Sequence, residues 1–200
     1  MKANNMMKII NCMAVSGILS LTACQAMAMD RESTQEGKNH LKLPHANNEI
    51  LTDNRIIKVL STTNHGEIKQ AKTALPKLKA DDTRKYAQMM INEHSSNETK
   101  VQELASRLQL TPQVSHTSTS LQKNSDKIVS KLTKSSNTTI DKDYMMSQVK
   151  EHRKVLMLID KQLIPNTNNS DLKSMLAQTR TTVAKHLQTA KQILIKINEK

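Results

Sequence analysis

The strongest constraint on the fold is a helical pattern of apolar residues that recurs in four long stretches of the chain. In each stretch, apolar side chains follow one another at steps of three and four residues, which places them on one face of an α-helix. The stretches cover about residues 52–79, 81–110, 139–163 and 170–198. Helices of this kind bury their apolar faces against one another, so the pattern predicts an antiparallel four-helix bundle.

Composition argues against a sheet protein. The 200 residues include two Tyr, no Phe, no Trp and three Gly, so the chain lacks the aromatic side chains and turn glycines that sheets and hairpins use. We therefore expect an all-α protein with one folded domain over residues 52–198. Asp81 or Asp82 is expected to cap the second helix, and Pro76 to disturb the end of the first. Residues 111–139 are expected to form a long crossover with a short amphipathic helix.

The first 23 residues predict an export signal. Lys2 and Lys8 precede a mostly apolar stretch over residues 9–21 that is too short to span a bilayer comfortably. The following Leu-Thr-Ala-Cys resembles a bacterial lipobox, which implies a lipid on Cys24 and a membrane anchor. The alternative is cleavage after Ala28, which would give a soluble periplasmic protein.

The segment after the signal predicts a tether and an envelope location. Residues 24–51 are polar and without sustained periodicity, which is typical of a flexible linker. Gln25 stands where lipoproteins kept in the inner membrane carry aspartate, and this implies the inner leaflet of the outer membrane, with the periplasm as the alternative. Removing Lys2 and Lys8 from the formal net charge of +12 leaves +10.

That basic charge favours anionic envelope components such as phospholipid head groups as neighbours. Lysines spread through every helix also fit a surface that is only solvated, and both interpretations remain. Export argues against nucleic acid as a partner, and the sequence leaves the oligomeric state open.

Each helical stretch carries one titratable residue on its apolar face; these residues are Glu67, His94, His152 and His186. Glu67 and His94 lie about equally far from the turn near residue 80, so we expect them at one depth. Counted from the turn near residue 166, His152 lies about fourteen residues before it and His186 about twenty after it, a poorer match. Glu93, Glu98 and Glu151 are expected to face solvent.

Three imidazoles and a carboxylate are ligands that suit zinc, copper or iron, so Glu67, His94, His152 and His186 form a candidate metal site. The same residues also suit a hydrogen-bonded polar core that fixes the helix register without a metal. The sequence leaves both alternatives open.

Short motifs along these stretches resemble a known family. They are Gly66-Glu67-Ile68, the run Lys85 to Met90 leading to Glu93-His94, the run Ile140 to Tyr144, Glu151-His152, and the run Ala184 to Leu187. Their order is similar to that of bacterial envelope proteins of unknown function with a ferritin-like four-helix fold, often labelled outer-membrane proteins. The resemblance covers residues 52–198 and implies a fold and an envelope location, but no reaction.

The di-iron members of the wider ferritin-like group carry a glutamate three residues before a metal-binding histidine. The corresponding positions here hold Ile91, Val149 and Val183, so a di-iron centre is not expected and a mononuclear site remains. No nucleophile motif, phosphate loop or acid pair is visible, so enzymatic activity ranks last. Two functions remain: a non-catalytic structural or binding role in the envelope, and metal binding for storage, buffering or stress protection with one transition-metal ion.

Overall fold

The computed structural model describes residues 49–199, and this part of the chain is all-helical. The long helices are α1 (Asp53–Ala74), α2 (Asp81–Arg107), α3 (His116–Lys134), α4 (Ile140–Leu158) and α6 (Ser170–Asn198). A π-helix, η1 (Ile159–Leu163), and a short helix, α5 (Ile164–Asn166), continue α4. The predicted signal, Cys24 and nearly all of the predicted tether lie outside the described residues. Within the described residues, no helix is long and apolar enough to cross a membrane.

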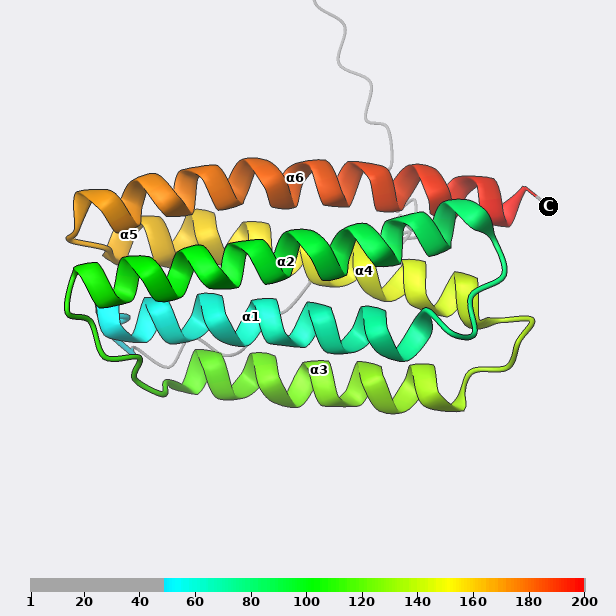
Figure 1. The fold of residues 1–200 in the computed structure, drawn as a ribbon, viewed down its shortest axis with the longest axis horizontal. Helices are drawn as coiled ribbons and strands as arrows, with labels where there is room; N and C mark the ends of the chain where they lie inside the picture. Colours follow the sequence, from blue (N-terminus) through cyan, green and yellow to red (C-terminus); the bar gives the residue numbers. More distant parts are fainter. Residues whose placement is uncertain (1–48, 200) are drawn as a thin grey trace, which may run out of the picture. The chain divides into compact units, whose positions relative to one another are not determined.

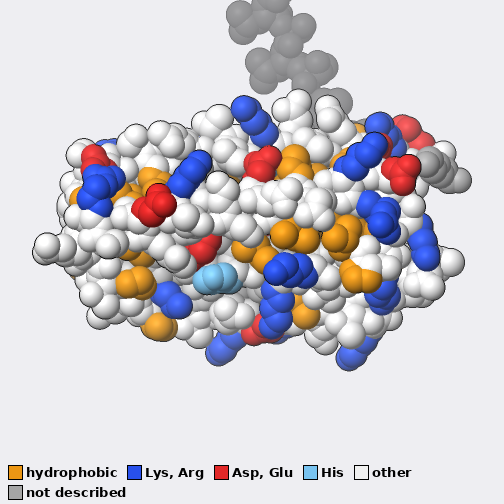
Figure 2. Space-filling model, viewed as in Figure 1, with side chains coloured by type: hydrophobic (Ala, Val, Ile, Leu, Met, Phe, Trp, Pro, Cys, Tyr) orange, Lys and Arg blue, Asp and Glu red, His pale blue; other side chains and the backbone are white. Residues whose placement is uncertain are grey.

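The long helices lie side by side (Figure 1). Helix α1 packs against α2 on one side and against α3 on the other, and α4 packs against α6. The group of α1, α2 and α3 meets the pair of α4 and α6 where α2 contacts α6 and where α4 contacts α3 and α1. The lysine and arginine side chains on the face drawn in Figure 2 are scattered among uncharged residues.

Helix α1 is shorter than expected and ends at Ala74, two residues before Pro76. The proline ring would clash with the preceding helical turn, so the chain leaves the helix in a turn over residues 75–77. The expected cap of α2 is also wrong. Its N-cap is Ala80, which has no side-chain cap, and the Asp141 carboxylate from the start of α4 accepts hydrogen bonds from the backbone N–H groups of Lys79 and Ala80.

The predicted crossover contains a full helix rather than a short one. Helix α3 has 19 residues and begins with a capping box between Ser115 and Ser118. It approaches α1 closely at Gly66, where a Cβ atom would lie 3.0 Å from Ser125 Oγ. At its other end, the Lys77 ammonium donates hydrogen bonds to the carbonyls of Leu132 and Thr133 and so fastens the last turn of α3.

The third predicted stretch, over residues 139–163, continues past its expected end and runs through Pro165. The π-helix η1 precedes Pro165 and has wider turns than an α-helix. In it, the Ile164 N–H donates a hydrogen bond to the Ile159 carbonyl five residues back. A widened turn leaves room for a proline ring that an α-helix would exclude. The chain therefore stays helical to Asn166, and the side chain of Asn169 caps α6 by accepting from the N–H groups of Asp171 and Leu172.

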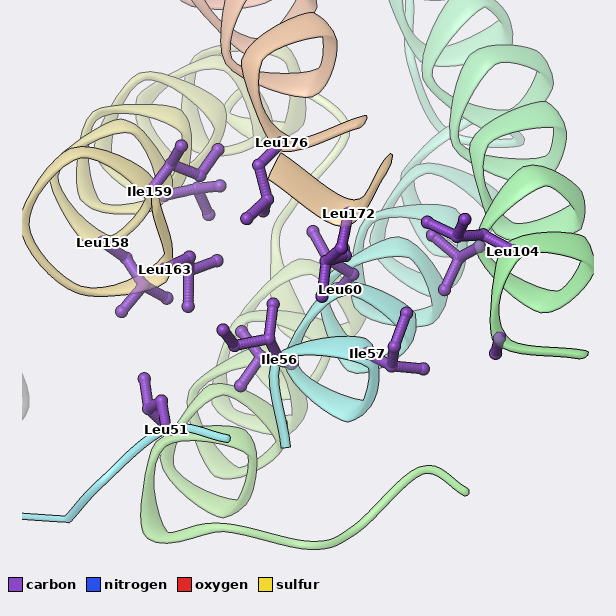
Figure 3. Close-up of a cluster of buried hydrophobic side chains, with 14 of the residues drawn as sticks. Leu51, Ile56, Ile57, Leu60, Leu104, Leu158, Ile159, Leu163, Leu172 and Leu176 are labelled. Carbon is purple, nitrogen blue, oxygen red and sulfur yellow. The ribbon is translucent and has the colours of Figure 1, made fainter. Parts of the chain in front are cut away.

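Two apolar clusters hold the helices together. The first gathers at one end, where Leu51 and the start of α1 meet the end of α2, the end of α4, η1 and the start of α6. Figure 3 shows Ile56, Leu60, Leu163 and Leu172 of this cluster converging. The second includes Met90, Tyr86, Leu132, Tyr144 and Ile193. Between the two clusters the buried side chains are polar, and this polar layer contains the histidines and Glu67.

Candidate metal centre

Three histidines from three helices meet in the polar layer. His94 lies in α2, His152 in α4 and His186 in α6, and all three are buried. Their ring centroids are 5.3 to 6.0 Å apart, and one ring nitrogen of each lies within 4.8 Å of one from each of the others. A tetrahedral ion with metal–nitrogen bonds of about 2.0–2.1 Å holds its ligands about 3.3 Å apart. Small side-chain rotations therefore bring these nitrogens to one ion.

The sequence places His152 and His186 at different depths, but the structure brings their rings to 5.3 Å. The helix that carries His152 continues through η1 and α5 to Asn166, so the turn into α6 comes at residues 167–169. This later turn removes most of the expected mismatch, because it lengthens the path from His152 and shortens the path to His186.

The proton on His94 is fixed by hydrogen bonds that lead to a carboxylate. The Glu98 carboxylate accepts from Asn64 Nδ2 at 3.1 Å, which turns the Asn64 Oδ1 toward His94 Nδ1, also at 3.1 Å. Since an amide oxygen only accepts, His94 Nδ1 carries the proton and donates it. The other ring nitrogen, Nε2, keeps its lone pair.

The other two imidazoles are oriented in the same way. His152 Nδ1 donates to the backbone carbonyl of Gln148 at 2.9 Å, and His186 Nε2 donates to the Glu93 carboxylate at 2.8 Å. Histidines that bind metals usually donate their second N–H to a carbonyl or carboxylate, which fixes the tautomer and the ring orientation. Each histidine here has such an acceptor.

The remaining three ring nitrogens are buried and find no hydrogen-bond partner within residues 49–199. They are His94 Nε2, His152 Nε2 and His186 Nδ1. A buried polar atom without a partner costs about 1–3 kcal/mol. A single cation that accepts all three lone pairs would satisfy them together, so the donor set fits a transition-metal ion of the zinc, copper or iron type.

The surroundings keep these imidazoles neutral. Burial lowers the pKa of His152 from 6.5 to about 3, and the neighbouring His186 lowers it further. Burial also lowers the pKa of His94 well below its ordinary value, helped by the other two rings. The pKa of His186 is lowered by burial as well, although its contact with Glu93 opposes the shift. Neutral imidazoles are the form that binds metal, so no proton competes for the lone pairs near pH 7.

Glu67 lies in the polar layer but is not one of the clustered ligands. The group of potential metal ligands found among the described residues consists of the three histidines. Glu67 instead accepts a hydrogen bond from Gln148 Nε2 at 2.9 Å, and the residue opposite His94 is Asn64, nearly one helical turn earlier in α1. Because α1 ends at Ala74, the turn into α2 comes earlier than expected, and His94 meets an earlier part of α1.

Burial raises the pKa of Glu67 from 4.5 to about 8, and the charge of Glu151 raises it further, while the Gln148 hydrogen bond opposes the shift. Glu67 therefore carries a proton near pH 7. A protonated carboxyl is a poor metal ligand, which agrees with its position outside the histidine group.

Two further glutamates were expected to face solvent, and this expectation is wrong. Glu98 is buried between α1 and α2 and accepts from Ser61, Asn64 and Gln102. Glu151 is buried beside Asn124 and Lys154. Glu93 is exposed, as expected, and its carboxylate orients His186. The helical spacing between His94 and Glu98 is a signal that could have placed Glu98 near the site, because residues four apart share a helix face.

A pocket connects the histidines to the surface between α2 and α6. Its volume is about 220 Å³. His94 and His186 line it together with Glu93, Asn97, Lys100 and Thr179, among other residues. His152 is not part of its wall, so the pocket reaches the cluster from one side and gives an ion a path from solvent.

Comparison with known proteins identifies a family model that matches residues 40–193, described as a domain of unknown function, DUF4142. No curated protein and no solved structure matches the chain.

Proposed function

Because the chain belongs to the DUF4142 family of domains of unknown function, we propose its function from its own residues: it binds one transition-metal ion through His94, His152 and His186. The observation that carries the proposal is the set of three buried ring nitrogens without partners, on rings whose opposite nitrogens all donate to acceptors. Zinc, copper and iron suit such a donor set.

The proposed setting is the cell envelope. The support is the sequence alone: an export signal over residues 1–23, Cys24 as the site of a lipid anchor, and a tether that follows it. In this setting the protein stores or buffers the ion, or protects the envelope from it, without catalysis. The basic charge adds a general attraction to anionic head groups. The ferritin-like arrangement belongs to the same proposal, with α1, α2, α4 and α6 as its four helices and α3 as an addition.

Metal analysis of the protein purified without chelators tests the ion site. We expect one equivalent of bound ion in the wild type and a loss of it in the double variant His94→Ala, His152→Ala. A matched control is His65→Ala, His116→Ala, which removes two exposed histidines and should keep the ion. Trace metal in all three proteins, after incubation with zinc, would reject the proposal in favour of a polar core that only fixes helix register.

Metabolic labelling of cells with a fatty-acid analogue tests the anchor. We expect the label on the wild type and none on Cys24→Ser. A label that persists in Cys24→Ser, or an unlabelled wild-type protein that begins after Ala28, would show that the lipid anchor is wrong.

A further inference from the structure

The three histidines leave a coordination position that the described part of the chain does not fill. Three protein ligands plus one exchangeable ligand is the arrangement of open zinc sites, whereas a fourth protein ligand closes a site. Glu67, which the sequence offers as the fourth ligand, instead accepts a hydrogen bond from Gln148. Glu93 and Glu98 are not among the clustered ligands. Glu93 accepts a hydrogen bond from His186, and Glu98 accepts one from Asn64.

The open side faces the pocket between α2 and α6. His94 and His186 form part of the pocket wall and His152 does not, so a ligand that enters the pocket approaches the cluster opposite His152. The pocket volume of about 220 Å³ exceeds the roughly 10–15 Å³ that a cavity needs to hold one water molecule. There is room for a small molecule of several atoms.

Charge favours an anion in this position. Three neutral imidazoles leave the charge of a divalent ion uncompensated among its direct ligands, and in a buried site that imbalance is costly. The pocket wall holds one carboxylate, Glu93, which is bonded to His186 and offsets one of the two charges of the ion. It also holds one ammonium, Lys100, which is exposed and forms no ion pair within the described residues, so a net positive charge remains for an anion to balance. Hydroxyl and amide groups, including Thr179, Thr182 and Asn97, provide donors beside it.

We propose that the metal centre keeps one position open toward this pocket and that a small monovalent anion binds the ion there. The inference rests on the proposed metal site and adds the class of its exchangeable ligand. Water or hydroxide takes the position when no such anion is present.

Cobalt substitution with azide as the probe tests the inference. Cobalt(II) bound by three imidazoles has a visible d–d absorption that reports the number and type of ligands. We expect azide to change this absorption in the wild type to saturation. The variant Thr179→Phe fills the pocket from α6 and should still bind one equivalent of cobalt by metal analysis but lose the azide response. Thr181→Phe introduces the same side chain at an exposed position outside the pocket and should respond like the wild type.

A second variant tests the charge of the pocket without filling it. Lys100→Gln should weaken azide binding by about threefold to tenfold, because it removes a positive charge near the anion. Lys191→Gln, at an exposed position on the same protein but outside the pocket, should not change it.

The outcomes separate the two proposals. If no cobalt absorption develops in the wild type, the proposed metal site is wrong and the inference falls with it. If cobalt binds but azide has no effect, the site is closed and only the inference is overturned. If azide acts on Glu93→Gln but not on the wild type, Glu93 is the fourth ligand, and the inference is likewise overturned. An undiminished azide response in Thr179→Phe would exclude the pocket as the route.

Discussion

At the scale of single residues, the hydrogen bonds around the histidines carry the argument for a metal. Helical periodicity alone could place His94, His152 and His186 on buried faces. It could not identify Asn64 as the partner of His94, because that pairing depends on where α1 ends and therefore on the turn at Pro76. The apolar pattern of one helix contains no information on its depth relative to the next helix. A shift of α1 by nearly one turn relative to α2 places Asn64, and not the expected Glu67, opposite His94.

Replacing the acceptor of His94 should weaken metal binding without removing a ligand. In Asn64→Ala the ring loses the group that fixes its orientation and its proton, and the metal affinity should fall about tenfold to a hundredfold. A competition titration against a chromogenic chelator measures this. Asn92→Ala, an exposed asparagine bonded to Gln88, is the control and should keep the wild-type affinity. Equal affinity in all three proteins would show that Asn64 does not support the ligand.

Glu67 should make the metal-free protein less stable as the solution becomes alkaline. Its pKa is 4.5 in the unfolded chain and about 8 in the fold, so between these values the native state holds a proton that the unfolded state has lost. The contribution of Glu67 to the free energy of unfolding is fully present below pH 4.5 and is lost as pH rises through about 8.

Glu67→Gln should therefore flatten the decline in the free energy of unfolding between about pH 4.5 and 8, a decline of at most about 1.4 kcal/mol per pH unit. Urea denaturation of metal-free protein at several pH values measures it. Glu103→Gln changes an exposed glutamate and should keep the wild-type slope. An unchanged slope in Glu67→Gln would mean that Glu67 is ionised in the fold.

At the scale of elements, α3 shows what apolar periodicity misses. Its buried residues are Thr117, Ser118, Ser125 and Leu132, so three of the four are hydroxyl side chains that a search for apolar residues does not count. Small polar side chains let α3 lie close to α1 at Gly66. The other long helices could be predicted because each buries several large apolar side chains at helical spacing, although their ends shifted at Pro76 and Pro165.

Leu132 is the α3 residue that is fully buried in an apolar cluster, while Ile128 and Leu121 are partly buried against the two clusters. Leu132→Ala should lower the free energy of unfolding by about 2–5 kcal/mol, because it removes apolar contacts and leaves a cavity. Thermal or urea denaturation measures the loss. Val114→Ala, which trims a side chain that is 64% exposed just before α3, should change stability by less than about 0.5 kcal/mol. A similarly small effect of Leu132→Ala would mean that α3 is only loosely attached.

At the scale of the whole molecule, the candidate ion would join α2, α4 and α6, and so link the α1–α2 side of the fold to the α4–α6 side. The all-helical class followed from composition and periodicity. The contact between α2 and α6 that brings the histidines together could not be predicted, because it depends on how two helical pairs pack.

Bound metal should raise the melting temperature. A ligand that binds only the folded state at one hundred times its dissociation constant stabilises it by about 2.7 kcal/mol, which corresponds to about 5–11 °C for a protein of this size. Differential scanning calorimetry with zinc, and again after EDTA, measures the shift. The double variant His94→Ala, His152→Ala should melt at one temperature in both conditions. If the melting temperature of the wild type also stays the same with zinc and after EDTA, the folded state has no metal site.

The two apolar clusters and the polar layer between them have a consequence for the local stability of the helices. Helices ordinarily fray from their ends, but here apolar clusters hold both ends, while the middle contains imidazoles whose inward lone pairs need a cation. Removal of the ion would leave both apolar clusters packed and destabilise the polar layer. Backbone amides around His94, His152 and His186 would then exchange with deuterium soonest. Hydrogen exchange in the middle of these helices would then depend on whether the ion is bound.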